Sequence, residues 1–193
     1  METIWESEPD LDALRRSHAM LAANPLEALK ELRKLADRGS VMSMIYIANS
    51  YRTGVGTDKD LYQAQEWYRC AAQKGSPLAA YELGRIYLEE NNYVKAREAF
   101  ESGSAKNYAP SMHMLARMYL LGTGVTRDIS RAKDLLEQAV SLGHVFSKRN
   151  LGVLLLKGCF GPSKIPRGIL LIASAIKEAV YLGLHDPTSD RLR

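Results

Sequence analysis

The sequence predicts an all-α fold, a solenoid of stacked antiparallel helix hairpins, from three observations. Apolar residues recur three and four positions apart rather than at alternate positions, which favours helices over strands. Four segments share one pattern, with an aliphatic residue, then Ala or Gly, then Tyr or Leu three residues later, at intervals of 36, 32 and 36 residues. Glycine and proline separate these segments regularly, as is typical of repeat proteins.

Each of the four segments is predicted to form the first helix of a hairpin. They are IANSYRTGVG (47–56), LGRIYLEENN (83–92), LARMYLLGTG (115–124) and LGVLLLKGCF (151–160). Their small residues, Ala48, Gly84, Ala116 and Gly152, leave room for a closely crossing second helix. Large residues such as Tyr51, Trp67, Tyr87, Phe100 and Tyr119 are expected to fill the space between hairpins. Because one hairpin cannot bury both of its faces, several must stack.

A second helical block follows each first one. These blocks are AQEWYRCAAQKG (64–75), AREAFESGSAKN (96–107), AKDLLEQAVSLG (132–143) and IASAIKEAVYLG (172–183). Each ends at a residue suited to the left-handed position after a helix, namely Gly75, Asn107, Gly143 and Gly183. LEALKELRKLADRG (26–39) matches this block again, and Asp10 is predicted to cap an initial helix over about residues 10–23. We therefore predict an N-terminal helix pair (1–40), four repeats (41–184) and a polar tail (185–193).

Composition and charge limit the class of protein. The chain has 193 residues, 46% of them apolar and 25% charged, with a net charge of +4 and no run of five like charges, so nucleic-acid binding is not indicated. Cys70 and Cys159 lie far apart, which suggests a reducing compartment. The segment METIWESEPD does not resemble a signal peptide, and no stretch of 18 apolar residues predicts a membrane span. The expected location is the cytoplasm.

The loop GVGTDKD (54–60) allows two interpretations, a phosphate-binding loop or a turn between helices. A phosphate loop would need Lys-Ser or Lys-Thr at the start of a helix that follows a strand, and neither is present. The related GTGVTRD (122–128) recurs 68 residues later. The turn is therefore favoured, with glycines supplying positive φ values and Asp60 and Asp128 capping the next helices.

GTGVTRDISRAKDLLEQAVSLG (122–143) resembles the Sel1-like repeat (SLR), a branch of the tetratricopeptide (TPR) superfamily. The residues that match in this repeat are Leu115, Tyr119, Gly122, Gly124, Val125, Asp128, Ala132, Ala139 and Gly143. Those that match in the first repeat are Tyr51, Gly54, Gly56, Asp60, Ala64, Trp67, Ala71, Ala72 and Gly75, with Thr57 in place of valine. The resemblance covers about residues 26–184 and implies a right-handed α-solenoid that binds proteins, usually in a bacterial cytoplasmic adaptor or regulator.

Two repeats depart from the family's pattern. The second lacks the glycine loop, and its LEENNYVKA (88–96) is similar to an ordinary tetratricopeptide repeat. The fourth has a longer loop, KGCFGPSKIPRG (157–168), with two prolines and a changed glycine pattern.

No set of residues predicts catalysis, a cofactor or a metal site. SAIK (174–177) fits the Ser-x-x-Lys nucleophile motif of penicillin-recognising enzymes, and some members of the repeat family have been linked to penicillin binding, but the companion motifs are absent. The four histidines lack a second ligand at metal-binding spacing. Cys70 is expected to be a small buried residue. We therefore predict that the protein is not an enzyme, with a penicillin-recognising hydrolase as an alternative.

A binding groove is predicted on the first helices of the hairpins, by analogy with tetratricopeptide arrays. For the first repeat the pair is Tyr46 and Ser50 or Ile45 and Asn49, depending on helix rotation. The groove residues that we select are Asn49, Arg52, Tyr81, Arg85, His113, Arg117 and Arg149. Such a basic groove suits an acidic partner protein or a peptide carboxylate. In the alternative, these arginines pair with Glu82, Glu89 or other nearby carboxylates.

The last predicted helix, GILLIASAIKEAVYLG (168–183), is apolar nearly all round, although an outermost helix needs a polar outer face. Either the tail LHDPTSDRLR (184–193) covers it or a partner does, which includes dimerisation through this helix. The function predicted overall is a non-catalytic scaffold or adaptor. A toxin-neutralising immunity protein of the same fold is a further alternative.

Overall fold

A computed structural model describes residues 8–185, which form ten α-helices and one short 3₁₀ helix, without strands in this part of the chain. The chain divides into two compact units, up to Asn91 and from Asn92 onward. The predicted all-α class is confirmed. The predicted boundaries 1–40, 41–184 and 185–193 stay a prediction, and residues 186–193 of the predicted tail lie outside the described residues.

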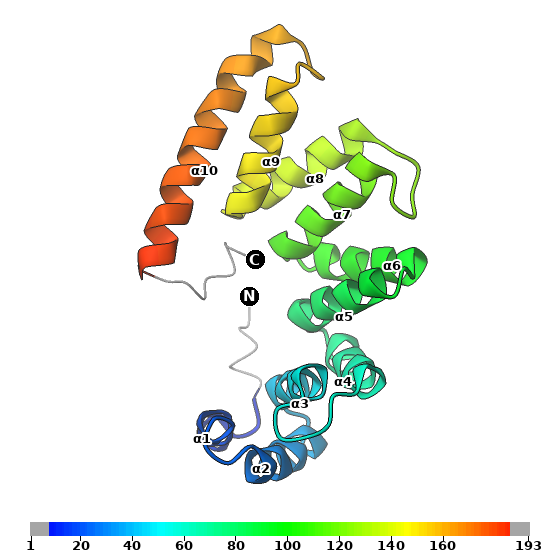
Figure 1. Ribbon diagram of the computed structural model, residues 1–193, viewed down its shortest axis with the longest axis vertical. Coiled ribbons are helices and arrows are strands. Elements are labelled where there is room, and N and C mark those ends of the chain that lie inside the picture. The colour runs from blue at the N-terminus through cyan, green and yellow to red at the C-terminus, as the bar shows by residue number, and fades with distance from the viewer. Residues whose placement is uncertain (1–7, 186–193) are drawn as a thin grey trace. The chain divides into compact units, whose positions relative to one another are not determined.

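The first unit contains two helices that precede the first full repeat, then the α3/α4 hairpin, then the first helix of the second repeat (Figure 1). Its helices are α1 (Leu11–Met20), α2 (Pro25–Asp37), α3 (Val41–Thr53), α4 (Leu61–Gln73) and α5 (Pro77–Glu89). Each helix packs on the next one along the chain from α1 to α5. The initial helix is shorter than the predicted 10–23.

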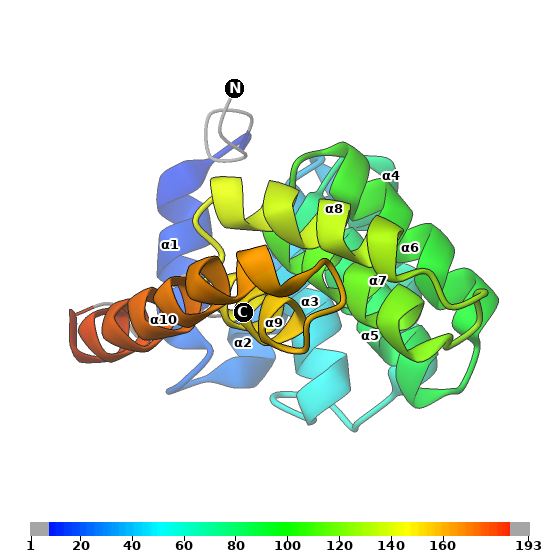
Figure 2. The same ribbon diagram turned by 90° about the horizontal axis from the view of Figure 1, so that it is seen from above.

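The second unit contains the α7/α8 and α9/α10 hairpins, and in both the two helices lie side by side (Figures 1 and 2). Its elements are α6 (Tyr93–Ala105), α7 (Ala109–Leu121), α8 (Ile129–Ser141), α9 (Val145–Leu156), η1 (Pro162–Lys164) and α10 (Ile165–His185). The loop of the fourth repeat is shorter than the predicted 157–168, because α10 already begins at Ile165. Pro166 fits in the first turn of that helix, where a missing N–H costs little.

Aspartate side chains cap the starts of three helices, and residues with positive φ follow the ends of three helices, as the sequence predicts. The carboxylates of Asp10, Asp60 and Asp128 each accept a hydrogen bond from the backbone N–H three residues later, at 2.9, 3.0 and 2.9 Å. Gly75, Asn107 and Gly143 have positive φ after their helices. Gly183 does not, and this prediction was wrong, because α10 continues through it to His185.

The glycine loops pack against the start of an earlier helix. A Cβ added to Gly56 would lie 2.8 Å from Cβ of Pro25, the first residue of α2. A Cβ added to Gly124 would lie 2.3 Å from Cβ of Tyr93, the first residue of α6. Since real Cβ atoms do not approach so closely, glycine is required by space as well as by φ. The loops therefore fix the spacing between successive hairpins.

Small residues lie at the helix crossings, as predicted. Ala48 and Ala64 on α3 and α4, and Ala116 and Ala132 on α7 and α8, are fully buried. In the last hairpin, a Cβ on Gly152 would lie 2.6 Å from Ile172 Cγ1 and 2.9 Å from the Gly168 carbonyl oxygen. The backbones of α9 and α10 thus approach closely because neither crossing residue carries a side chain.

One packing prediction for α4 was wrong. Cys70 is exposed, not buried. Trp67 is only half-buried, while the neighbouring Tyr68 is completely buried. The buried face of α4 runs through Ala64, Tyr68 and Ala71, which are spaced four and three residues apart and therefore share one side of the helix. Trp67 and Cys70 lie outside that stripe.

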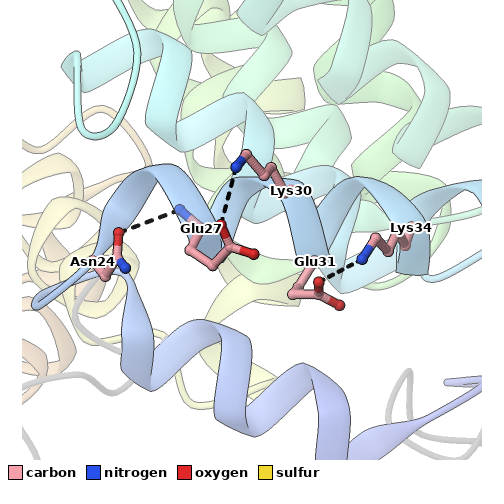
Figure 3. Close-up of polar contacts among 5 residues, drawn as sticks. All are labelled: Asn24, Glu27, Lys30, Glu31 and Lys34. Carbon is pink, nitrogen blue, oxygen red and sulfur yellow. Dashed lines mark hydrogen bonds and ion pairs between the residues drawn. The ribbon is translucent and has the colours of Figure 1, made fainter.

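The surface of α2 shows how the exposed side of a second helix is stabilised (Figure 3). Asn24 accepts a 3.4 Å hydrogen bond from the Glu27 N–H, and Lys30 and Lys34 form ion pairs of 3.1 and 2.6 Å with Glu27 and Glu31. The hydrogen bond and negative charge of Glu31 raise the pKa of Lys34. Exposed pairs of this kind contribute little to stability, so this face is chiefly a solvated one.

Candidate protein-interaction site

The predicted groove residues of the first unit surround the hydroxyl of Tyr68. This buried hydroxyl donates a 2.7 Å hydrogen bond to Asn49 Oδ1 on α3. Burial, followed by the nearby Glu82 carboxylate, raises the pKa of Tyr68, while Arg52 and Arg85 oppose that rise. Tyr68 therefore stays protonated and connects α4 to α3, with Arg52 and Arg85 close enough to influence its charge.

Arg85 lies on α5 beside Glu82 and Tyr81. Its guanidinium forms a 3.1 Å ion pair with Glu82, and its Cζ lies 5.8 Å from the centre of the Tyr81 ring. Arg85 therefore pairs with Glu82, as the alternative interpretation of the sequence expects. The Arg85 side chain is still 38% exposed, whereas Tyr81 is only 7% exposed. A ligand could therefore contact Arg85, but little of Tyr81.

Arg52, at the end of α3, has no carboxylate within ion-pair distance among residues 8–185. Its side chain is half-buried, and its Nε atom is shielded from solvent without a hydrogen-bond partner in the described part of the chain. The guanidinium lies close enough to the Tyr68 hydroxyl to oppose the rise of its pKa through charge and a hydrogen bond.

The groove residues of the second unit surround His113. The His113 ring is buried, its Nε2 lies 2.8 Å from Asn150 Nδ2, and its centre lies 5.0 Å from that of His144. Burial, then the nearby His144, Arg117 and Arg149, lowers the pKa of His113 to about 3. His113 is consequently neutral at physiological pH, and Nε2 accepts a hydrogen bond from the Asn150 amide.

Arg117 and Arg149 supply the positive charge around His113. Both are exposed, and in the described residues neither has a carboxylate within ion-pair distance. Arg117 Nη1 lies 3.7 Å from the Met114 sulfur. Arg149 Cζ lies 5.8 Å from the centre of the Phe146 ring, and Nη2 donates a 3.4 Å hydrogen bond to Asn150. Both guanidinium groups can still bind an anionic group.

The structure therefore brings the predicted residues together in two groups, one in each unit. Sequence reasoning missed the residues at the two centres, Tyr68 and Asn150. The spacing of Ala64, Tyr68 and Ala71 could have identified Tyr68, since residues i, i+4 and i+7 share a helix face. Asn150 has no such signal, because it is found only through its contact with His113, 37 residues earlier.

In the Ser-x-x-Lys segment, the Ser174 hydroxyl contacts residues other than Lys177. The Ser174 hydroxyl lies 3.4 Å from Lys148 Nζ on α9 and 3.4 Å from Glu178, while Lys177 is exposed. Lys148 also forms an ion pair with Glu178. The polar partners of Ser174 therefore lie outside the motif's own lysine.

Within residues 8–185, no three side chains of His, Cys, Asp or Glu gather where they could hold a metal ion. No helix in that range is both long and apolar enough to cross a membrane.

A protein-family model described as the Sel1 repeat matches residues 41–76, 77–101 and 109–144, which together make up half of the chain. The first and third matches coincide with the α3/α4 and α7/α8 hairpins.

Two relatives are similar in sequence to parts of this chain. The chain is 34% identical over 133 residues to the ERAD-associated E3 ubiquitin-protein ligase component HRD3B of Arabidopsis thaliana, covering 65% of this chain. It is 30% identical over 89 residues to the putative sel1-like repeat-containing protein L21 of Acanthamoeba polyphaga mimivirus, covering 46% of this chain. The alignments span only 20% and 17% of those two relatives.

Two solved structures share the fold. A protective antigen of uropathogenic Escherichia coli strains, which displays an SLR fold, has a TM-score of 0.77 at 22% identity, over 86% of this chain and 38% of the antigen. A Sel1 repeat protein from Oxalobacter formigenes has a TM-score of 0.74 at 21% identity, over 96% and 86% of the two chains. The predicted helical-solenoid class is thereby confirmed.

Proposed function

The chain belongs to the Sel1-repeat family, and we propose that it is a non-catalytic scaffold or adaptor that binds an acidic partner protein or peptide through the first helices of its hairpins. Sel1-repeat proteins typically mediate protein–protein interactions. The proposal adds to this general role two surfaces, one in each unit, and a negative charge for the partner. The first surface has Asn49, Arg52 and Arg85, and the second has Arg117 and Arg149.

The observation that carries the proposal is a set of guanidinium groups without carboxylate partners among residues 8–185. These are Arg52 on α3, Arg117 on α7 and Arg149 on α9, each on the first helix of a hairpin. On second helices, Arg69 and Arg97 form ion pairs with Glu66 and Glu101. Arg33 and Arg131, also on second helices, contact the Tyr51 hydroxyl and the Tyr119 ring instead. Carboxylates of a partner would supply the missing charge-assisted hydrogen bonds.

The residues around these arginines hold them without neutralising them. Tyr68 stays protonated and His113 stays neutral, so neither adds nor removes a charge at physiological pH. In the first unit, Arg85 shares its charge with Glu82 but keeps an exposed guanidinium that a second carboxylate could reach. Each unit thus offers arginine donors beside polar groups already fixed by the fold.

The name of one relative supports the same class of role. The protein HRD3B is described as a component of an E3 ubiquitin-protein ligase, and a component acts within an assembly of proteins. Because the alignment covers a fifth of that protein, the ligase itself is not transferred to this chain. What transfers to the proposal is participation in a protein assembly.

Affinity capture from the native host followed by mass spectrometry tests the proposal. The wild-type chain is expected to enrich acidic proteins, and the double variant Arg85→Glu with Arg117→Glu is expected to lose them. Several weakly held partners support an adaptor, whereas a single tightly held partner supports the alternative of an immunity protein. Formation of a covalent adduct between Ser174 and a labelled β-lactam would contradict the non-catalytic role.

A further inference from the structure

Two charged residues of α10 reach neighbouring helices, while five of its large apolar residues are exposed. Arg167 forms a 3.3 Å ion pair with Glu137 of α8, and Glu178 forms an ion pair with Lys148 of α9. The small residue Ala175 of α10 is buried and packs with Val145 of α9 in an apolar cluster. Unlike an outermost helix with a polar outer face, α10 leaves five of its large apolar side chains mostly exposed.

The exposed apolar side chains form one continuous stripe along α10. Ile169, Leu170, Ile176, Val180 and Tyr181 are 56–70% exposed. With the exposed Ala173 they recur at intervals of three and four residues, the spacing of a face that packs against another helix. Elsewhere in the described residues, exposed apolar side chains occur singly, such as Leu121, or in pairs, such as Leu61 with Tyr62 and Val153 with Leu156. A patch of this kind marks a contact site.

The segment that follows α10 in the sequence does not match the stripe. Residues 186–193 read DPTSDRLR, in which Leu192 is the one large apolar residue. Such a segment lacks the apolar side chains needed to cover five large ones. The stripe itself carries one charge, Lys177, so it offers little to select a strongly charged partner.

We infer that the α10 stripe is a dimer interface, occupied by α10 of a second copy of this chain. A two-fold axis makes an interface self-complementary, because the same patch is used by both copies. In an antiparallel pair the small Ala173 and Gly183 leave space for the bulky Ile and Val side chains of the partner helix. Lys177 lies within the stripe, one turn from both Ala173 and Tyr181, and its long stem can pack while the ammonium reaches water.

The available surface suits such a dimer. At 1.5 Å per residue the 21-residue helix is about 30 Å long. Five side chains of this size, more than half exposed over that length, approach the roughly 800 Å² per partner of a standard interface. The packing of α10 on α9, including Ala175 and Leu182 against Val145, holds α10 in its own unit, so the stripe is a preformed surface.

Sedimentation equilibrium of the full chain over a range of concentrations tests this inference. The wild type is expected to reach twice the 21.5 kDa mass of one chain. Leu170→Glu with Ile176→Glu is expected to weaken dimerisation about a hundredfold, since it places charges in the apolar centre. Leu121→Glu is the matched control, because Leu121 and Leu170 are both 70% exposed, and it should leave the dimer unchanged.

Two outcomes would overturn the inference. One is a wild type that stays monomeric at the highest soluble concentration, which would leave the stripe to a different occupant. The other is a dimer that the double Glu variant does not weaken, while its circular dichroism stays that of the wild type. Because both substituted side chains are exposed, a loss of helical signal is not expected for any of these variants.

Discussion

The second glycine of each glycine loop, Gly56 or Gly124, has no room for a side chain. The sequence predicts the positive φ of these residues from the turn chemistry alone, and the structure confirms it, at 76° and 67°. The second reason for glycine could not be predicted, because the blocking residues, Pro25 and Tyr93, lie 31 residues earlier in the chain. A steric limit set by distant residues leaves no local pattern.

Comparing two glycines separates these two reasons. Gly124 and Gly158 have similar φ values, 67° and 71°, but a Cβ on Gly158 would meet nothing within 4 Å. Gly158→Ala should therefore cost about 1–2 kcal/mol of unfolding free energy from its left-handed backbone. Gly124→Ala should cost about 1–3 kcal/mol more because of the clash with Tyr93. Urea unfolding measures both, and equal losses would contradict the steric account.

The buried His113 makes stability depend on pH. Its pKa is lowered to about 3 in the folded chain, against 6.5 when exposed. Between these values the unfolded chain binds the proton and the folded chain does not, so stability falls as pH falls. At pH 5 the loss attributable to His113 is about 2 kcal/mol.

The variant His113→Gln tests this loss, since Gln keeps an acceptor for Asn150 but does not titrate. Between pH 7.5 and 5 it should lose about 2 kcal/mol less unfolding free energy than the wild type. The measurement is urea unfolding at both pH values. If both proteins lose the same amount, the low pKa of His113 is not the cause.

At the scale of single elements, the helix boundaries are where sequence reasoning succeeds most fully. Capping depends on a side chain and a backbone N–H three residues away, so Asp60 and Asp128 are recognisable without any tertiary structure. Gly183 shows the limit. The same residue type that ends α4 and α8 lies inside α10, because packing along α9 extends that helix beyond its local stop signal.

The cap of α4 can be tested against a neighbouring aspartate. Asp60→Ala removes the hydrogen bond to the Gln63 N–H and should cost about 1 kcal/mol of unfolding free energy. Asp58→Ala removes an exposed carboxylate of the same loop and should change stability by less than about 0.5 kcal/mol. Thermal unfolding of both variants makes the comparison. A loss from Asp58→Ala as large as that from Asp60→Ala would show that loop charge matters more than capping.

At the scale of the whole molecule, periodicity predicted the repeated hairpins, because each hairpin buries its apolar faces against its neighbours in the same way. The candidate site was less predictable. Helix periodicity indicated the helix face that carries Asn49, Arg85 and Arg117, but it could not show which arginines form an ion pair with a carboxylate. Arg85 is paired and Arg117 is not, and that difference depends on the choice of one neighbouring residue, Glu82 in one case and Met114 in the other.

The central claim is that the arginines of the first helices bind the partner. The most direct measurement is the dissociation constant of a captured partner by titration calorimetry, for wild type and for Arg85→Glu with Arg117→Glu. We expect the double variant to bind at least about a hundredfold more weakly with unchanged helical content, since two charge-assisted contacts become repulsive. The control Arg69→Glu breaks an equivalent ion pair, with Glu66, on a second helix and should bind like wild type. An unchanged affinity of the double variant would contradict the claim.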